Sequence, residues 1–445
     1  MNTLELKKGF YWTGMHDPDL RVFDITMYTE FGTTYNSYLL KGSEKTALFE
    51  SNKAKFLPEY LEKLQSLTDL SQLDYLVVDH TEPDHAGCVE ALLSLCPKLK
   101  IVGTPAALNF LQQIVNRNFP NISVKENDTL SLGDKTLRFM ALPNLHWPDT
   151  MFTYVEEDKT LITCDSFGAH YSHPGILRST VTDIEGYNRA TKYYFDNILG
   201  PFKRPYMSNA LERIKDLPFD MICTGHGPVL DSHIDEILDS YRAWCATPAP
   251  RERKVVVMPY VSAYGYTKAL AQEITRGLND KGIDVHSFDM VETDPVLVTG
   301  ELAEADAFLF GSPTIVGDAL PPIWNLLSSM HAATHGGKPA SAFGSYGWSG
   351  EAVPHLTERL RQLKLNVMDG YRVRLKPNAQ ELAGAYSFGQ NFGKLMLGEK
   401  EDSPASAPVS SEKKVRCDVC GAIFAEGPDK CPVCGADPTH FKPLN

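Results

Sequence analysis

Apolar and polar positions follow two periods along the first 250 residues. Short apolar or β-branched runs, such as residues 73–78 (LDYLVV) and 160–164 (TLITC), have no helical period and predict buried strands. Residues 88–96, 105–115 and 187–198 are expected to form helices between such strands. Nearer the N-terminus we expect single strands over residues 21–28 and 35–40. The first part of the chain should therefore alternate strands with helices.

A second strand–helix region begins at residue 254. Residues 254–260 (KVVVMPY) form a continuous apolar run typical of parallel sheets, and a helix is expected over 268–281. Further strands are expected at 284–288, 307–311, 340–344 and 366–371. This alternation predicts a doubly wound parallel sheet, which binds its ligand at the carboxyl ends of the strands.

Length and composition limit the classes of protein. A chain of 445 residues suggests roughly three domains. We expect one domain over 1–250, a second over 251–398, a flexible Ser-, Pro- and Ala-rich linker over 399–414, and a small domain over 415–445. The net charge of −13 argues against nucleic acid or an anionic membrane surface as partner. No stretch approaches the roughly 20 apolar residues of a membrane helix, and the N-terminus lacks a signal core, so we expect a cytoplasmic protein.

Potential metal ligands are concentrated in one short run after the strand at residues 73–78. The segment from Asp79 to His85 carries two imidazoles and two carboxylates at the spacing His-x-Glu-x-Asp-His. Alternate residues of an extended chain face opposite ways, so such a run can supply ligands to two adjacent metals. The other interpretation is a polar loop that caps the following helix. Four potential ligands within six residues disfavour it.

Three more residues of ligand type follow other strands. His146 follows residues 138–145, Asp165 follows the strand at 160–164, and His226 lies between Gly225 and Gly227 after residues 221–224. The flanking glycines allow the backbone to approach closely. Each residue alone is typical of a turn. Together, strand ends that deliver such groups to one side of a sheet sandwich predict a shared metal site.

Hydroxyl-bearing and aromatic residues gather in three loops of the second region. The first loop, at a helix N-terminus, makes an anion cradle suited to a terminal phosphate, without the pattern of a Walker A or dinucleotide motif. The other two carry small residues for close backbone approach and aromatic residues that can flank a flat ring. The candidate binding residues are Ser262, Ala263, Tyr264, Gly265, Tyr266, Thr267, Ser312, Pro313, Thr314, Ile315, Ser345, Tyr346, Gly347 and Trp348.

Four of the nine cysteines lie in the last 30 residues as two C-x-x-C pairs. Cys417 and Cys420 form one pair, Cys431 and Cys434 the other, with ten residues between the pairs. This spacing strongly indicates a tetrahedral Cys₄ site, in which zinc and iron share the same ligands. The other five cysteines are scattered, mostly inside apolar runs, which fits free thiols in a reducing compartment.

The order of the ligand-type residues resembles that of the metallo-β-lactamase fold, an αββα sandwich whose usual signature has His where Glu82 stands. A carboxylate in place of an imidazole favours iron or manganese over zinc. The second region looks like a flavodoxin domain that binds FMN, and the Cys-Pro-x-Cys-Gly knuckle at Cys431 looks like a short-spaced rubredoxin. The expected fold class is α/β: a metallo-β-lactamase-like αββα sandwich, then a flavodoxin-like doubly wound parallel sheet, then a small Cys₄ rubredoxin-like knuckle domain.

The order of parts, from about residue 4 to 398, resembles the flavodiiron proteins, which reduce O2, NO or both. The resemblance implies FMN, a non-haem di-iron centre and, beside those redox groups, one iron in the Cys₄ site. The implied ligands are His80, Glu82 and His146 for one iron, Asp84, His85 and His226 for the other, and Asp165 as the bridge. His85 is a ligand in most members, and water replaces it in some. One departure is Val316-Gly317, where the family more often has Asn residues.

The resemblance also implies a path for electrons, from rubredoxin through FMN to the di-iron site. A separate NADH:rubredoxin oxidoreductase is the expected donor, because the chain carries no NAD-binding fingerprint. A head-to-tail homodimer, or a dimer of dimers, is expected to bring one chain's FMN beside the partner's irons. His170 and Tyr193 are candidate proton donors, and Trp348 is a candidate for lining the gap between flavin and irons. The alternatives are a zinc hydrolase of the same fold with redox domains attached, and a non-catalytic electron carrier or gas sensor.

Overall fold

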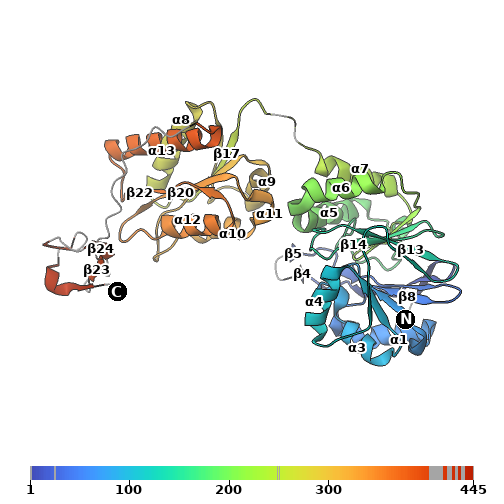
Figure 1. Ribbon diagram of the computed structural model, residues 1–445. Helices are drawn as coiled ribbons and strands as arrows, with labels where there is room; N and C mark the ends of the chain where they lie inside the picture. Colours follow the sequence, from blue (N-terminus) through green and yellow to red (C-terminus); the bar gives the residue numbers. More distant parts are fainter. Residues whose placement is uncertain are drawn as a thin grey trace. The chain divides into compact units, whose positions relative to one another are not determined.

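The computed structural model describes residues 3–24, 27–247, 249, 251–399, 414–417, 423–425, 429–431 and 436–443. The chain divides into two compact units, Met1–Pro248 and Ala249–Asn445 (Figure 1). Among the described residues, no helix combines the length and the apolar character needed to cross a membrane.

Two β-sheets form the centre of the first unit. The larger sheet has seven strands, in the order β1 (Leu4–Lys7), β2 (Phe10–Trp12), β7 (Tyr38–Lys41), β8 (Thr46–Phe49), β9 (Tyr75–Val77), β10 (Lys100–Gly103) and β11 (Asn121–Ser123). The smaller sheet has five, in the order β12 (Thr129–Ser131), β13 (Thr136–Ala141), β14 (Met151–Val155), β15 (Thr160–Cys164) and β16 (Met221–Thr224).

Helices cover the outer face of each sheet. Beside the larger sheet lie α1 (Leu57–Leu67), α2 (Pro83–Ala86), α3 (Val89–Leu95) and α4 (Pro105–Val115) (Figure 1). Beside the smaller sheet lie α5 (Ile184–Tyr194), α6 (Ser208–Ile214) and α7 (Ile234–Cys245) (Figure 1).

Alternation of side chains along the strands builds three apolar layers. Phe49 and Val77 of the larger sheet pack with Phe139 and Ile162 of the smaller one, which closes the sandwich. The neighbouring residue Leu76 points the other way and packs with the helices of its own side. Phe152 and Leu161 pack in the same manner with residues of α5, α6 and α7. The layers are helix, sheet, sheet and helix, as the sequence predicts.

The expected single strand over residues 21–28 is wrong. Two short strands, β4 (Val22–Phe23) and β5 (Met27–Tyr28), pair antiparallel instead. Asp24 after β4 has a φ of 47°, a left-handed conformation that ends the first strand. Two further short strands, β3 (Met15–Asp17) and β6 (Thr33–Tyr35), also pair with each other. Strand periodicity alone did not reveal the reversal at Asp24.

A doubly wound sheet forms the main body of the second unit. Parallel strands run in the order β18 (Asp284–Asp289), β17 (Val255–Tyr260), β19 (Ala307–Gly311), β20 (Pro339–Tyr346) and β21 (Asn366–Val367), and β22 (Tyr371–Arg374) also pairs with β20. Its helices are α8 (Tyr266–Asn279), α9 (Pro295–Glu304), α10 (Pro321–Ser328), α11 (Ala332–His335), α12 (Ala352–Gln362) and α13 (Ala379–Leu397). Strand β17 is buried throughout because helices pack on both faces.

The expected strand over residues 366–371 is also wrong, because it is split between β21 and β22. Gly370 stands at the break, and a Cβ atom there would lie 2.3 Å from Val353 Cγ1 and 2.8 Å from the Ala342 carbonyl oxygen. The chain therefore passes too close to its neighbours at Gly370 for any larger residue. Beyond this body, β23 (Lys414–Cys417), β24 (Ile423–Ala425) and β25 (Phe441–Pro443) form a small antiparallel sheet.

Candidate di-metal centre and flavin loops

The segment between β9 and α2 carries its polar side chains inward. Pro83 is the first residue of α2 and fixes the start of that short helix. Glu82 occupies the N-cap position, but its side chain makes no capping hydrogen bond. His80, Asp84 and His85 are buried. The interpretation of this segment as a helix cap is therefore wrong.

One group of side chains meets at the second carboxylate oxygen of Asp165. His80 Nε2 and His146 Nε2 lie 3.6 and 3.3 Å from Asp165 Oδ2. The same two nitrogens lie 3.2 and 3.1 Å from Glu82 Oε2. The four residues come from three strand ends, those of β9, β13 and β15.

A second group meets at the other oxygen of Asp165. His85 Nε2 and His226 Nε2 lie 3.0 and 3.5 Å from Asp165 Oδ1. They also lie 3.6 and 3.2 Å from the carboxylate of Asp84. His226 reaches this position from the loop after β16. Asp165 thus presents one oxygen to each group, which is the arrangement a bridging carboxylate needs.

The donor atoms of the two groups are spaced as metal ligands are. Bonds of about 2.1 Å in tetrahedral or octahedral geometry place ligand atoms about 3.0–3.4 Å apart. In the described part of the chain, neither carboxylate oxygen of Asp84 or Asp165 has a hydrogen-bond donor in good geometry, and His85 Nε2 is also unsatisfied. Such buried atoms are costly unless a cation satisfies them. Each group therefore fits one metal ion.

In two of the imidazoles, Nδ1, the nitrogen that does not face the metal positions, is held by a residue that the sequence analysis did not identify. His80 Nδ1 lies 3.3 Å from both oxygens of Asp149, which also accepts hydrogen bonds from the backbone N–H and hydroxyl of Thr81. His226 Nδ1 donates to the Thr34 carbonyl oxygen at 2.6 Å. Such partners fix the tautomer and leave Nε2 for the metal. The only sequence signal was the position of Asp149, three residues after His146.

Two more acidic residues near the ligands also escaped the sequence analysis. Glu50 is buried after β8, and its Oε1 accepts the backbone N–H groups of Asp79 at 2.6 Å and His80 at 3.2 Å. Asp24, directly after β4, lies beside Glu82. Burial, followed by the charges of Glu82 and Asp84, raises the pKa of Asp24 to about 6. Neither residue belongs to a recognisable motif.

The two candidate proton donors have different surroundings. His170 is buried, its ring centroid lies 5.2 Å from that of His226, and burial lowers its pKa well below the ordinary value. Tyr193 is 40% exposed on α5. Its neighbour Tyr194 is the residue whose ring packs against His170 and His226. The structure thus brings His170 to the site and leaves Tyr193 outside it.

A very small cavity opens onto the two ligand groups. Its volume is about 10 Å³, and its lining comprises Phe23, Glu82, His146, Asp165, Tyr194, Ile198 and His226. A cavity of that size accommodates about one water-sized molecule. Aromatic and aliphatic side chains form one side of it and the predicted ligands the other.

The three predicted flavin loops lie at the carboxyl ends of β17, β19 and β20. Polar contacts join them: Thr267 Oγ1 lies 3.0 Å from Ser345 Oγ, and the Thr314 backbone N–H donates to the Ser345 carbonyl at 2.9 Å. The aromatic side chains at their tips are exposed, Tyr264 by 81% and Trp348 by 60%. The loops thus form a polar backbone cradle with aromatic residues at its rim, which fits a phosphate-bearing flat ligand.

Half of the predicted Cys₄ site lies within the described residues. Cys417 at the end of β23 and Cys431 are both buried. Cys420 and Cys434 lie outside the described residues.

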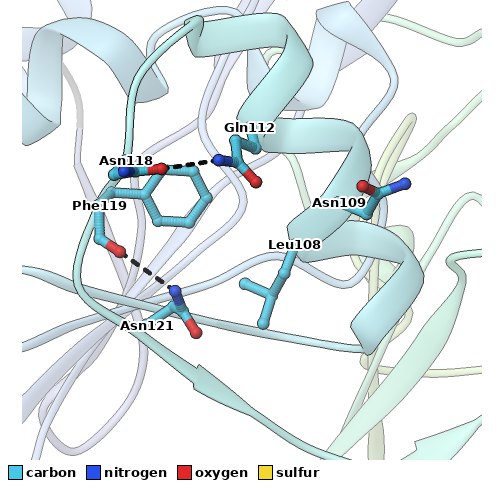
Figure 2. A pocket seen from close by; sticks show the side chains of 6 residues that line it. All are labelled: Leu108, Asn109, Gln112, Asn118, Phe119 and Asn121. Carbon is cyan, nitrogen blue, oxygen red and sulfur yellow. Dashed lines mark hydrogen bonds between the residues drawn. The ribbon is translucent and has the colours of Figure 1, made fainter.

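A surface cavity lies on α4, and none of its lining residues belongs to the sites described above. It has a volume of about 330 Å³ and is lined by Leu108, Asn109, Gln112, Asn118, Phe119 and Asn121 (Figure 2). Two of the amides are already engaged, because Gln112 donates to Asn118 and Asn121 donates to the Phe119 carbonyl. The lining contains no charged or nucleophilic side chain, so this cavity offers no group for acid–base or nucleophilic catalysis.

Family models match three successive parts of the chain. An ODP family β-lactamase model matches residues 33–227, a flavodoxin model residues 259–389, and a model of the rubredoxin-like domain of rubrerythrin residues 416–442. The fold and the two ligand groups therefore define a redox protein in which a β-lactamase-like metal domain is joined to flavin and rubredoxin-like domains.

Curated relatives and solved structures agree with this class. The flavo-diiron protein FprA2 of Clostridium acetobutylicum is 39% identical over 403 residues, which span 88% of this chain and 100% of that protein. Type A flavoprotein fprA of Rhodobacter capsulatus is 36% identical over 88% of this chain and 91% of its own length. Rubredoxin oxygen:oxidoreductase of Desulfovibrio gigas matches with a TM-score of 0.65 and 28% identity, over 89% of this chain and 99% of that one. The flavodiiron protein of Giardia intestinalis matches with a TM-score of 0.63 and 29% identity, over 89% and 97%.

The chain belongs to the flavodiiron protein family. It is an oxidoreductase whose cofactors are FMN in the flavodoxin domain, two irons in the β-lactamase-like domain and one iron in the rubredoxin-like domain. The choice between zinc and iron that the cysteines alone left open is thereby settled for iron.

Proposed function

We propose that this chain reduces O2 to water, NO to N2O, or both, at a di-iron centre in its first domain. The observation that carries the proposal is the position of Asp165, which presents Oδ2 to His80, Glu82 and His146 and Oδ1 to Asp84, His85 and His226. When bound, two ferrous ions supply electrons together to a small diatomic substrate.

The protein's own residues hold the metals and shape the cavity. Four imidazoles and three carboxylates form the donor set, and no thiolate is among them. Imidazole and carboxylate donors suit iron, whereas thiolate donors are typical of cysteine-rich zinc sites. Asp149 and the Thr34 carbonyl orient His80 and His226 so that each Nε2 points inward. Phe23 and Tyr194 exclude bulk water from the cavity beside these ligands.

The donor set disfavours the alternative of a zinc hydrolase. A zinc enzyme of this fold would be expected to carry His where Glu82 stands, and it would gain nothing from a flavin domain. Bound zinc together with thioesterase turnover would revive that alternative.

The three loops of the second domain are proposed to bind FMN, and the four C-terminal cysteines to hold the iron that receives electrons. In this proposal the candidate residues of the three loops contact FMN, and the hydroxyl groups of Thr267 and Ser345 lie at its phosphate end. We propose a separate NADH:rubredoxin oxidoreductase as the donor. Trp348 would line the gap between flavin and irons, and His170 would stand beside the cavity as a proton carrier.

We also propose a head-to-tail homodimer or a dimer of dimers. Exposed apolar side chains occur beside both reactive regions: Val22 and Tyr28 on the β4–β5 pair that borders the metal cavity, and Tyr264 and Trp348 on the flavin loops. Exposed apolar surface of this kind commonly marks an interface. Light scattering coupled to size-exclusion chromatography measures the oligomeric state, and a monomer would contradict the proposal.

The function is tested by purifying the full chain without oxygen, measuring its iron and FMN, and following O2 and NO consumption with a rubredoxin-reducing electron supply. Faster loss of O2 identifies an oxygen reductase, and faster loss of NO identifies a nitric oxide reductase. Loss of neither gas by a fully loaded protein would contradict the proposal and favour the electron carrier or gas sensor.

A further inference from the structure

The imidazoles of the metal centre differ in the group that contacts Nδ1, the ring nitrogen that does not face the metal positions. His80 Nδ1 faces the Asp149 carboxylate, and His226 Nδ1 faces the Thr34 carbonyl at 2.6 Å. His85 Nδ1 faces the thiol of Cys164, with 3.6 Å between nitrogen and sulfur. Sulfur is a weak hydrogen-bond acceptor compared with a carboxylate or carbonyl oxygen. His85 is therefore the least firmly oriented of these three rings.

Cys164 occupies its position through an irregular strand end. The pairing of β15 with β16 shifts register between Ile162 and Cys164, and Cys164 has a φ of 46°. This bulge turns the following residue, Asp165, toward the metal site while the thiol stays buried behind His85.

A carboxylate lies close to both the His85 ring and the Cys164 thiol. Glu50, His85 and Cys164 can each present a ligand-type atom within 4.8 Å of the others. Glu50 Oε1 is engaged by two backbone N–H groups, whereas Oε2 has no hydrogen-bond partner in the part of the chain that the structure describes. Glu50 Oε2 can therefore accept a hydrogen bond from the His85 ring if that ring turns.

We propose that Cys164 is a positioning residue that keeps the His85 ring in its metal-binding orientation, with Nδ1–H donating to Sγ and Nε2 directed at the second iron. Without the thiol, the ring turns and donates to Glu50 Oε2, and the second iron retains only Asp84, Asp165 and His226. This inference rests on the proposed assignment of His85 as a ligand.

The test compares three variants of the full chain. Cys164→Ala removes the acceptor, Cys164→Ser keeps one of similar size, and Cys223→Ala removes a buried thiol from the adjacent strand β16 as the control. Each protein is loaded with ⁵⁷Fe without oxygen. Iron per chain is then measured against a competing chelator, and the Mössbauer spectrum is recorded.

Loss of a partner behind a metal-bound histidine typically weakens metal binding about 10–100-fold. We expect Cys164→Ala to weaken the binding of one iron of the di-iron centre by about that factor and to change its Mössbauer signal, while the signals of the other di-iron ion and of the rubredoxin-like iron stay unchanged. Cys164→Ser should stay close to the wild type in both measurements. Cys223→Ala should lower thermal stability without changing either signal.

Two results would overturn the inference, and they differ in meaning. If folded Cys164→Ala binds both irons of the first domain with wild-type affinity and an unchanged spectrum, Cys164 does not position His85. If the first domain of the wild-type chain itself holds a single iron, besides the rubredoxin-like iron, the failure lies in the proposed di-iron assignment. Should Cys164→Ala fail to fold, a Cys164→Ser protein that loses one iron would equally contradict the expectation.

Discussion

The predicted metal ligands of the first unit and the predicted flavin contacts of the second both follow strand ends, yet their surroundings differ. Five of the seven metal ligands are buried, and their imidazoles are held from behind by protein groups such as Asp149. The rim of the flavin cradle is open, with Tyr264 81% and Trp348 60% exposed. The hydrogen bonds of the cradle itself are mostly made by backbone and hydroxyl groups.

This difference corresponds to what each region must hold. Metal ions need donor atoms fixed at short distances, so their site is assembled by buried side chains from several elements. A flat cofactor that exchanges electrons with another protein needs an accessible edge. We therefore expect a substitution of a metal ligand to abolish metal-dependent activity, and a substitution at the flavin rim to weaken FMN binding by a limited factor.

The largest effect is expected from Glu82→His, which replaces a carboxylate of the first ligand group by an imidazole. The change makes the group softer and favours zinc over iron. Gas consumption should fall by more than about 100-fold, while the FMN content stays unchanged because the flavin loops lie in the other unit. Metal analysis and O2 and NO electrodes measure the outcome. Wild-type turnover would show that Glu82 is not a ligand.

A smaller effect is expected from deletion of residues 399–445, which removes the rubredoxin-like domain. Covalent attachment can strengthen an interaction by about 10²–10⁴-fold, so turnover driven by an NADH:rubredoxin oxidoreductase should fall strongly if this domain delivers the electrons. Added free rubredoxin should restore it, and the iron and FMN of the core should be unaffected. A truncated core without iron would mean that the tail serves the structure of the metal domain.

A graded effect is expected at the flavin rim. Tyr264→Ala should weaken FMN binding about 5–10-fold, because one aromatic contact contributes roughly 1 kcal/mol. Tyr386→Ala is the matched control, since Tyr386 contacts Asp280 at the far end of α8 from the loop. Fluorescence titration of the apoprotein with FMN measures both. Equal affinity in the two variants would exclude Tyr264 from the flavin site.

The smallest effect is expected at the departure from the family pattern. Val316 and Gly317 both have positive φ, 57° and 74°, in the tight turn between Ile315 and Asp318. A β-branched residue is unfavourable there, and Val316 is 99% exposed, so it gains nothing from packing. Val316→Asn should stabilise the protein by about 0.5–1 kcal/mol.

Val291→Asn is the control for that change, because Val291 is exposed but has no positive φ. Thermal unfolding should show a higher midpoint for Val316→Asn alone. Equal shifts for both variants would indicate a general effect of removing exposed valine.

Periodicity predicted buried strands alternating with helices in both units, and ligand-type residues at the strand ends indicated the metal site. The helix–sheet–sheet–helix layers of the first unit were expected only from the resemblance to a known fold. The sequence did not predict what holds those ligands from behind. Asp149, Thr34 and Cys164 are ordinary polar residues whose roles depend on loops far apart in the chain. Nor did the sequence analysis select Tyr194 in place of Tyr193, although adjacent residues on a helix present different faces and only Tyr194 reaches the ligands.

The most direct test of the central claim is a combined Mössbauer and EPR measurement on the ⁵⁷Fe-loaded full chain. If Asp165 bridges two irons, each chain should hold two of them in the first domain, and the oxidised pair should be magnetically coupled and EPR-silent. The rubredoxin-like iron then supplies the only ferric EPR signal. A second isolated ferric signal, or zinc in place of one iron, would contradict the account.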